Sequence, residues 1–326
     1  MQRRHFIQTG FLATVAACIG RDTSLSENGA ESTLLAGLVP PTVPTVPLQK
    51  RICLFTDNLD DYGYSYEDVA KMIGSLKIAG PDLTVRPGGL VPPDRVVTEL
   101  PKAAAAFRDQ GLSIPMISTN LTSVDDPTAR PILSTMNKLG IGYYKLGYYH
   151  YHDLAKWEAE LAAQRKHLAG LTELSRSMKI QAGFHNHSGA GIGGALWDAW
   201  EFLSPLDPAA VGFYFDPAHA SIEGAKHAWK LNLQRISPRL TMIALKDYVW
   251  EKTSGGGWQT RWCPLGTGMV DWKEFFRLLS QFPFPGPISI HIEYETGGST
   301  RPERIDNSLA AAQRDIAFVL QHLGMA

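Results

Sequence analysis

The chain has 326 residues, of which 44% are hydrophobic and 19% are charged. This balance is typical of a globular protein with a large core. The formal net charge is -1, so no surplus of basic residues is available to neutralise a phosphate backbone, and we expect no nucleic-acid partner.

The first residues have the pattern of an export signal. Arg3 and Arg4 precede a short apolar run that ends at Ile19, and this run is too short to be a stable membrane span. The Arg-Arg-x-Phe-Ile sequence resembles a twin-arginine signal, with an ordinary secretory signal as the alternative. Val-Ala-Ala-Cys, which ends at Cys18, resembles a lipobox. We therefore expect residues 1–22 to direct export through the twin-arginine machinery, and the protein to be periplasmic or lipid-anchored to the cell envelope.

The next segment, residues 23–47, is polar and then rich in proline, which predicts an extended, flexible linker. From residue 48 to residue 326, short apolar runs alternate with longer segments of helical period. This pattern indicates repeated strand–helix units around a parallel sheet. Apart from Cys18, the only cysteines are Cys53 and Cys263. We expect two free, buried thiols, with a disulfide between them as the alternative.

Eight strand–helix units can be counted after the linker. The predicted strands cover residues 51–56, 82–86, 112–119, 142–147, 181–187, 211–216, 240–247 and 287–293. The predicted helices cover residues 66–78, 95–110, 128–139, 154–178, 195–203, 226–235, 272–281 and 308–322. Eight such units predict a single-domain α/β fold, the (β/α)8 TIM barrel. A doubly wound open sheet is the alternative, but no glycine-rich dinucleotide fingerprint follows the first strand.

Polar side chains gather where the predicted strands end, which is where a TIM barrel carries its active site. The strand ends supply Asp57, Asn58, Arg86, Thr119, Asn120, Lys145, His185, His187, Asp216, His219, Lys246, Asp247, His291, Glu293 and Glu295. Alternate side chains of a strand share one face, so His185 and His187 face the same way, as do His291 and Glu293.

Histidine, aspartate and glutamate side chains together suit one divalent cation, such as Mn²⁺, Mg²⁺, Co²⁺ or Zn²⁺. Asp216 at the tip of the sixth strand is the expected ligand there, and His219 in the following turn is the expected substrate contact or supporting group. His185 is the expected ligand on the fifth strand, with His187 as a supporting or substrate-binding group. The chain contains no cluster of cysteines, which argues against a structural zinc site.

Five motifs at these strand ends resemble one family. They are His-Asn-His ending at residue 187, Phe-Asp-Pro-Ala-His ending at 219, Leu-Lys-Asp ending at 247, Pro-Leu-Gly-Thr-Gly ending at 268, and Ile-Ser-Ile-His-Ile-Glu ending at 293. Their order and spacing resemble the xylose-isomerase-like TIM-barrel superfamily, which includes sugar isomerases and epimerases, inosose dehydratase and an apurinic endonuclease branch. The resemblance runs from Arg51 to the C-terminus. It implies one divalent metal held by acidic groups on strands five, six and eight and by a histidine on strand seven.

The resemblance can be carried over position by position. Asp216 matches the acidic ligand of strand six, and His185 stands where strand five often has glutamate. Strand eight offers His291 or Glu293, and spacing alone does not choose between them.

Strand seven departs from the family pattern, because Ala244 stands in the histidine position and cannot bind a metal. Asp247 or the second group of strand eight is a candidate replacement, and Asp247 is otherwise an expected substrate contact. This departure leaves a non-catalytic sugar-binding barrel as one alternative function.

The residues are suited to proton transfer beside a carbonyl group. A metal would polarise the carbonyl of a ketosugar or related polyol and acidify the neighbouring C–H bond. Glu293 is the expected base if His291 is the ligand, and Lys246 and Lys145 are the alternatives, since burial lowers a lysine pKa. Either lysine could instead form a salt bridge inside the barrel. Arg86 is expected to hold a substrate carboxylate or a pair of hydroxyls. The expected function is a metal-dependent sugar isomerase or epimerase, and its oligomeric state is left open.

Three tryptophans surround a glycine-rich stretch after the seventh strand, namely Trp250, Trp258 and Trp262. We expect a loop here whose indoles stack on sugar rings or pack over the barrel mouth. Because an exported enzyme meets glycosides, a 3-keto-glycoside lyase or hydrolase that uses the same metal site is a further alternative function.

Overall fold

The computed structural model describes residue 46 and residues 48–60 and 63–324. The expected export signal, the Cys18 lipid site and all of the expected linker except Val46 lie outside these residues. In the part of the chain that is described, no helix combines the length and the apolar character needed to cross a membrane.

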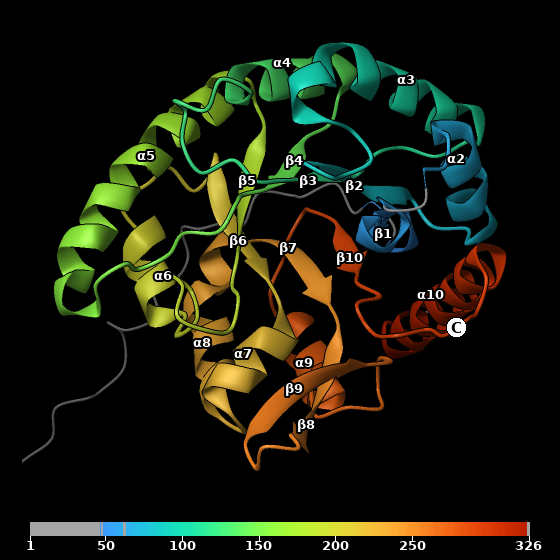
Figure 1. The fold of residues 1–326 in the computed structure, drawn as a ribbon. Helices are drawn as coiled ribbons and strands as arrows, with labels where there is room; N and C mark the ends of the chain where they lie inside the picture. The colour runs from blue at the N-terminus through green and yellow to red at the C-terminus, as the bar shows by residue number, and fades with distance from the viewer. Residues whose placement is uncertain (1–45, 47, 61–62, 325–326) are drawn as a thin grey trace, which may run out of the picture. The chain divides into compact units, whose positions relative to one another are not determined.

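The elements alternate regularly along the chain (Figure 1). The strands are β1 (Ile52–Phe55), β2 (Gly80–Val85), β3 (Met116–Thr119), β4 (Tyr143–Lys145), β5 (Gln181–His185), β6 (Val211–Phe215), β7 (Leu240–Leu245), β8 (Asp247–Lys252), β9 (Trp258–Cys263) and β10 (Ile288–Ile290). The α-helices are α1 (Asp57–Asp60), α2 (Tyr66–Ser75), α3 (Val96–Asp109), α4 (Ala129–Leu139), α5 (Trp157–Ser177), α6 (Trp197–Leu203), α7 (Pro217–Gly224), α8 (Ala228–Ile236), α9 (Trp272–Leu279) and α10 (Arg301–His322). Short 3-10 helices cover Leu48–Arg51, Pro93–Arg95, Leu154–Lys156 and Ser237–Arg239.

Eight parallel strands close into a barrel in the order β1-β10-β7-β6-β5-β4-β3-β2. Helices surround this barrel on the outside, as Figure 1 shows. The prediction of a single-domain (β/α)8 barrel is therefore confirmed, and the open sheet is excluded because β1 pairs with both β2 and β10. In this topology every strand delivers its C-terminal end to the same mouth.

The barrel interior is filled by its own small cluster, separate from the large core under the helices. Cys53, Met116, Tyr214, Met242 and Ala244 form this cluster, and all are fully buried. Ala244 is thus part of the packed barrel interior, and its methyl group has no atom that could bind a metal. Both Cys53 and Cys263 are free and buried, which confirms the expectation of unpaired thiols.

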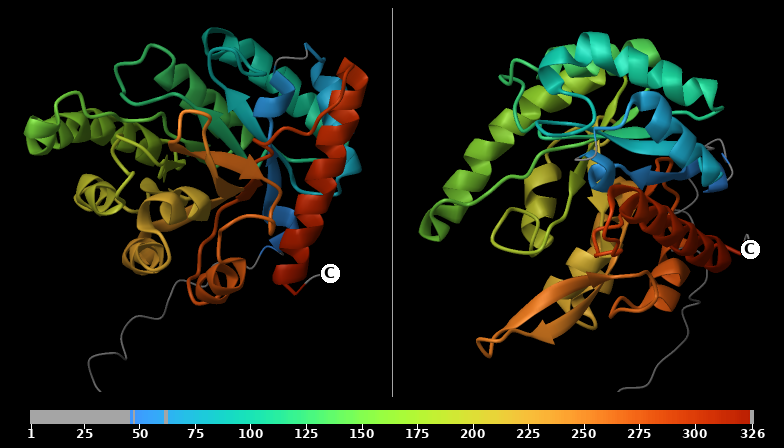
Figure 2. Two further views of the ribbon diagram at one scale, coloured as in Figure 1. Left: turned by 60° about the horizontal axis from the view of Figure 1, so that its bottom comes forward. Right: turned by 45° about the vertical axis from the view of Figure 1, so that its right-hand side comes forward.

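The segment after β7 is a β-hairpin and not the expected loop. Strands β8 and β9 pair antiparallel over their whole length, from Asp247 opposite Cys263 to Lys252 opposite Trp258. The hairpin extends away from the barrel in the right-hand view of Figure 2. Half-buried and exposed residues alternate along most of both strands, but the residue types do not show this period-two pattern clearly in the sequence.

Helix α7 was not predicted, and helix α10 begins earlier than predicted. In both cases the capping residues at the N-terminal end explain where the helix starts. Helix α7 begins directly after Asp216, whose side chain caps it, and Pro217 occupies its first turn; the sequence analysis expected only a turn there. Helix α10 begins at Arg301, seven residues before the predicted start. Thr300 and Glu303 form a capping box at this end, which satisfies backbone N–H groups that the helix itself cannot pair.

Candidate active site

The site lies at the C-terminal end of the barrel, where side chains at alternate strand positions point inward. On β6, Tyr214 belongs to the interior cluster, so Asp216, two residues later, points inward at the mouth. On β7, Ala244 is followed in the same way by Lys246. Both Asp216 and Lys246 are buried. The period-two alternation of parallel strands therefore delivers charged groups to the mouth directly above an apolar layer.

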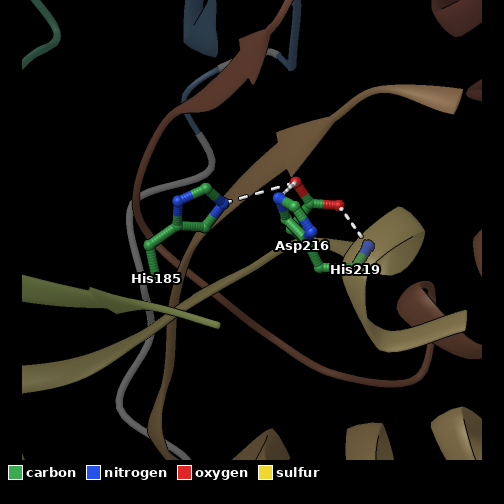
Figure 3. Close-up of side chains that lie close together, drawn as sticks. All are labelled: His185, Asp216 and His219. Atoms are coloured by element: carbon green, nitrogen blue, oxygen red, sulfur yellow. Dashed lines mark hydrogen bonds and ion pairs between the residues drawn. The ribbon is translucent and has the colours of Figure 1, made fainter. Parts of the chain in front are cut away.

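Three buried side chains, His185, Asp216 and His219, lie close together at this mouth (Figure 3). Nε2 of His185 is 3.3 Å from Oδ2 of Asp216, and Nε2 of His219 is 3.8 Å from the same oxygen. Oδ1 of Asp216 accepts hydrogen bonds from the backbone N–H groups of Ala218, at 2.8 Å, and His219, at 3.1 Å. Helix capping by one oxygen thus aims the other oxygen at the two imidazoles.

These three residues fit a divalent metal ion. One ligand atom from each lies within 4.8 Å of the others, and two imidazole nitrogens with one carboxylate oxygen suit ions such as Zn²⁺, Mn²⁺ and Co²⁺. Within the described part of the chain, the buried Nε2 of His219 has no hydrogen-bond partner, and a buried polar atom without a partner is costly.

The contacts of Nδ1 of His219 determine which of its two ring nitrogens carries the proton. Nδ1 accepts the backbone N–H of Ser188 at 3.2 Å, and the Ser188 hydroxyl is 2.9 Å away. While Nδ1 accepts this hydrogen bond, the neutral ring carries its own proton on Nε2. Metal binding at Nε2 would require that proton to move to Nδ1, which would then donate a hydrogen bond to the Ser188 hydroxyl oxygen and give up the one from the Ser188 N–H.

The two strand-eight candidates stand apart from this group. Nε2 of His291 is 2.9 Å from the hydroxyl of Tyr214, and Nδ1 is 2.9 Å from Oε1 of Glu293. Oε2 of Glu293 is in turn 2.9 Å from Nζ of Lys246. Of the four predicted ligands, the structure gathers His185 and Asp216 with His219, and it holds His291 and Glu293 in a pair of their own.

Sequence reasoning missed Asp82, the residue that holds His291 in place. This carboxylate is fully buried and accepts hydrogen bonds from Ser118 and Ser289, each at 2.8 Å, and from the hydroxyl of Tyr214 at 3.2 Å. Burial raises the Asp82 pKa, and His291 and the three hydroxyls counteract this shift. The available signal was an aspartate inside the buried strand Gly80–Val85, since aspartate is rarely buried without a partner.

Both ring nitrogens of His291 are engaged by neighbouring side chains. Nε2 faces the hydroxyl of Tyr214, which itself donates to Asp82, and Nδ1 faces the carboxylate of Glu293. A metal ion at either nitrogen would have to displace one of these partners.

Lys246 lies between the two acidic parts of the site. Its Nζ is 2.9 Å from Glu293 and 3.8 Å from Asp216, and it lies over the ring of Trp262 at 4.3 Å from the centroid. Burial by itself raises the Glu293 pKa, but Lys246 and His291 bring it well below its ordinary value. Glu293 is thus held as a carboxylate. A salt bridge inside the barrel was the alternative role for Lys246 and Lys145, and Lys246 forms one.

Lys145 has a different environment. Its Nζ donates to the carbonyl of Leu146 at 2.9 Å and lies 4.0 Å from the ring centroid of Tyr148. Burial, followed by repulsion from Arg86, lowers the Lys145 pKa to about 7. A lysine with this pKa exists in both protonation states near neutral pH, as an acid–base group requires.

The remaining predicted contacts lie at the rim. Arg86 forms an ion pair with Asp57. Part of the guanidinium group that was expected to bind substrate is therefore already engaged. The ring of His187 packs on that of His219 with 3.9 Å between centroids. Trp250 is on the hairpin and is 40% exposed.

The expectation that Asp247 contacts substrate or replaces a metal ligand is not supported by its position. Its carboxylate accepts from the backbone N–H groups of Tyr248, Gly266, Gly268 and Val270 at 2.9 to 3.2 Å, and from the indole of Trp272 at 2.8 Å. Because Lys246 points into the mouth, the next residue of the chain points the opposite way. Asp247 anchors the Pro-Leu-Gly-Thr-Gly segment instead.

This role makes Asp247→Ala a test of stability. The substitution leaves five donors without their acceptor, so we expect the free energy of unfolding to fall by about 3–5 kcal/mol, measured by urea denaturation. Asp306→Ala, at an exposed position of α10, serves as the control. A loss below about 1 kcal/mol would show that the segment does not depend on this carboxylate.

Comparison with known proteins agrees with the fold. The model of the xylose isomerase-like TIM barrel family matches residues 86–320, and the chain belongs to this family. No curated protein sequence matches the chain. Similar solved structures include a xylose isomerase-like TIM barrel protein from Mycobacterium smegmatis in complex with magnesium, with 17% identity, a TM-score of 0.58, and coverage of 80% of this chain and 89% of that one.

Of two further similar structures, one contains a sugar and the other a metal. D-Psicose 3-epimerase with D-tagatose from Clostridium cellulolyticum H10 has 11% identity and a TM-score of 0.62, covering 84% of this chain and 99% of that one. The IolI protein with a bound zinc atom has 12% identity and a TM-score of 0.63, covering 84% and 98%. At these identities the similarity establishes the fold.

Proposed function

We propose that the protein is a divalent-metal-dependent sugar isomerase or epimerase that transfers the proton on the carbon next to the carbonyl of a ketosugar. One observation carries this proposal: a metal-ligand group and two separate proton-transfer groups meet at one barrel mouth. The metal-ligand group is His185, Asp216 and His219, and the proton-transfer groups are Glu293 and Lys145. The sugar-handling members among the similar structures support the same substrate class.

The metal would be held by the two imidazoles and the carboxylate of this group. A bound divalent ion polarises a carbonyl oxygen and so acidifies the neighbouring C–H bond. Lys246, between Asp216 and Glu293, adds a positive charge where negative charge develops on the substrate oxygen.

The two proton-transfer groups come from opposite sides of the barrel. In the order of the closed sheet, β4 and β10 are four strands apart in either direction. Lys145 ends β4, and Glu293 follows β10. Epimerisation removes a proton from one face of a carbon and returns one to the other face, so two groups on opposite sides suit it. Glu293 is unprotonated before the reaction, as a base must be, and Lys145 can donate or accept a proton near pH 7.

Metal binding tests the ligand group directly. We expect purified protein to hold one divalent ion per chain, measured by elemental mass spectrometry. His185→Ala, Asp216→Asn and His219→Ala should each weaken binding by about 10–100-fold or more. The exposed His227→Ala variant should bind the ion normally.

The same measurement separates this ligand group from the one that the family resemblance implies. His291→Ala should retain the ion, because both ring nitrogens of His291 are engaged elsewhere. Loss of the ion from His291→Ala with retention in His219→Ala would overturn the assignment. For the reaction, metal-loaded protein should introduce solvent deuterium beside the carbonyl of a ketohexose or a 3-keto-glycoside in D₂O, followed by NMR over a panel of both kinds of sugar. Absence of exchange throughout the panel would reject the isomerase and epimerase proposal.

Export remains a proposal from the N-terminal sequence. We propose that residues 1–22 direct the protein to the periplasm or to a lipid anchor at Cys18. Mass spectrometry of the mature N-terminus from cells, with and without Arg3 and Arg4 replaced by lysine, tests this directly.

A further inference from the structure

A large groove opens beside Glu293, between the edge of the hairpin and helix α10. Its volume is about 840 Å³, within the range of about 300–1,000 Å³ of ligand sites. The groove is lined by residues that include Thr260, Trp262, Glu293, Tyr294, Asn307 and Arg314. Figure 1 shows β9 and α10 on either side of the loop that follows β10.

The groove is continuous with the proposed site of proton transfer. Glu293 belongs to both, and its side chain is 25% exposed whereas that of its partner Lys246 is 3% exposed. Trp262 also belongs to both, because its ring contacts Lys246 and lies edge-on to His219 at 5.2 Å between centroids. A molecule that places a reacting carbon at Glu293 can therefore extend into this groove.

The groove walls are held in place by contacts within the protein. The Tyr294 hydroxyl donates to Oδ2 of Asp315 at 2.8 Å and accepts from Arg314. Asp315 is fully buried, which anchors Tyr294 to the body of α10. Trp262 is fixed by Lys246 and His219. Walls that are already ordered cost little entropy on binding, so the groove is suited to a ligand of defined shape.

The chemistry of the lining favours a sugar ring. The aromatic faces of Trp262 and Tyr294 can pack against the apolar C–H surface of a pyranose. Thr260, Asn307 and Arg314 supply hydroxyl, amide and guanidinium groups that pair with sugar hydroxyls. Further tryptophans lie on the same face of the hairpin, because residues that pair directly across antiparallel strands share a face. The pairs on this face are Tyr248 with Trp262, Trp250 with Thr260, and Lys252 with Trp258. Trp250 and Trp258 are 40% and 61% exposed.

We infer that this groove binds the second, non-reacting sugar ring of a disaccharide or longer glycoside whose first ring reacts at Glu293. The inference rests on the proposed function for the place of the first ring and extends it to the substrate class: a glycosidically linked saccharide rather than a free monosaccharide. A linked second ring also makes elimination a possible outcome. If the oxygen joining the rings is attached to the carbon β to the carbonyl, Glu293 takes the proton from the α-carbon and the electron pair of that C–H bond forms a double bond between the two carbons. The bond from the β-carbon to the joining oxygen breaks, and that oxygen takes up the proton from Glu293 as the second sugar leaves.

Binding to the full-length protein tests the groove without relying on turnover. Titrations of the Glu293→Gln variant with maltose, cellobiose, trehalose and lactose, each against glucose, are followed by calorimetry. We expect at least one disaccharide to bind at least tenfold more tightly than glucose. Ala310→Trp should abolish this difference, because Ala310 is exposed on α10 and lines the groove. Ala317→Trp, at an exposed position of the same helix away from the groove lining, should retain it.

The outcomes separate the groove from the reaction. Equal affinity for glucose and every disaccharide, or an unchanged disaccharide preference in Ala310→Trp, would overturn the groove assignment. Since these titrations use the Glu293→Gln background, they hold whether or not the protein catalyses proton exchange. Failure of deuterium exchange on every ketohexose and 3-keto-glycoside would reject the proposed reaction and leave a disaccharide preference intact.

Discussion

Glu293→Gln is expected to reduce proton exchange on a ketosugar substrate by about 10²–10⁴-fold, the usual contribution of a positioned acid–base group. Glutamine keeps the size of the side chain and its contact with the groove, but it cannot accept a proton. Two neighbours hold the native group as a carboxylate, since Lys246 and His291 lie 2.9 Å from its two oxygens. The loss should appear in kcat with little change in KM.

Rates of deuterium incorporation in D₂O provide the measurement for Glu293→Gln. The matched control is Glu158→Gln, the same chemical change at an exposed position of α5, which should leave the rate unchanged. Circular dichroism and metal content should match the native protein, because Glu293 lies outside the His185–Asp216–His219 group. A Glu293→Gln rate within about threefold of native would remove Glu293 from the reaction, since this is far below the usual contribution.

Lys145→Met should reduce activity and increase stability at the same time. The activity should fall by about 10²-fold or more, because a group that titrates near neutral pH is lost. If neutral Lys145 is the base, the activity of the native protein should rise as the pH rises through about 7. The variant should lose this limb of the pH profile, and an unchanged limb would assign it to another group.

The stability gain follows from the lowered pKa. Lys145 titrates at about 7 in the folded protein, against an ordinary value of 10.5, so between these pH values the unfolded chain binds the extra proton. The cost of burying Lys145 is therefore complete below about pH 7 and disappears above the ordinary lysine pKa. The shift corresponds to about 5 kcal/mol, and losing the hydrogen bond to Leu146 and the contact with Tyr148 offsets part of it.

We expect Lys145→Met to raise the free energy of unfolding by about 2 kcal/mol at slightly acidic pH, with the gain shrinking as pH rises. Urea denaturation at several pH values measures it. Lys166→Met, at an exposed position of α5, is the control and should change stability by less than about 0.5 kcal/mol. A destabilised Lys145→Met protein with native activity would identify Lys145 as a structural residue.

The hairpin shows why one part of the fold was not predicted. The eight barrel strands were recognisable because both of their faces are buried and their sequences are continuous apolar runs. In β8 and β9, by contrast, exposed and half-buried residues alternate. The two strands pair with each other across a glycine-rich turn, for example Tyr248 with Trp262. The sequence places three tryptophans there, but strand pairing puts Trp250, Trp258 and Trp262 in line along one face.

Sequence alone determined the barrel, the mouth at which the polar groups meet, and the departure at Ala244, because these follow from the order of elements and the alternation of side chains along a strand. Tertiary structure decided how the groups pair. It joined His219 to His185 and Asp216 because helix α7 starts at the capping aspartate. It turned His291 toward Tyr214 and Asp82, and it oriented Asp247 toward the Pro-Leu-Gly-Thr-Gly segment. Spacing fixes which face a side chain takes, whereas its partner depends on which other strands and helices bring their donors and acceptors within hydrogen-bonding distance.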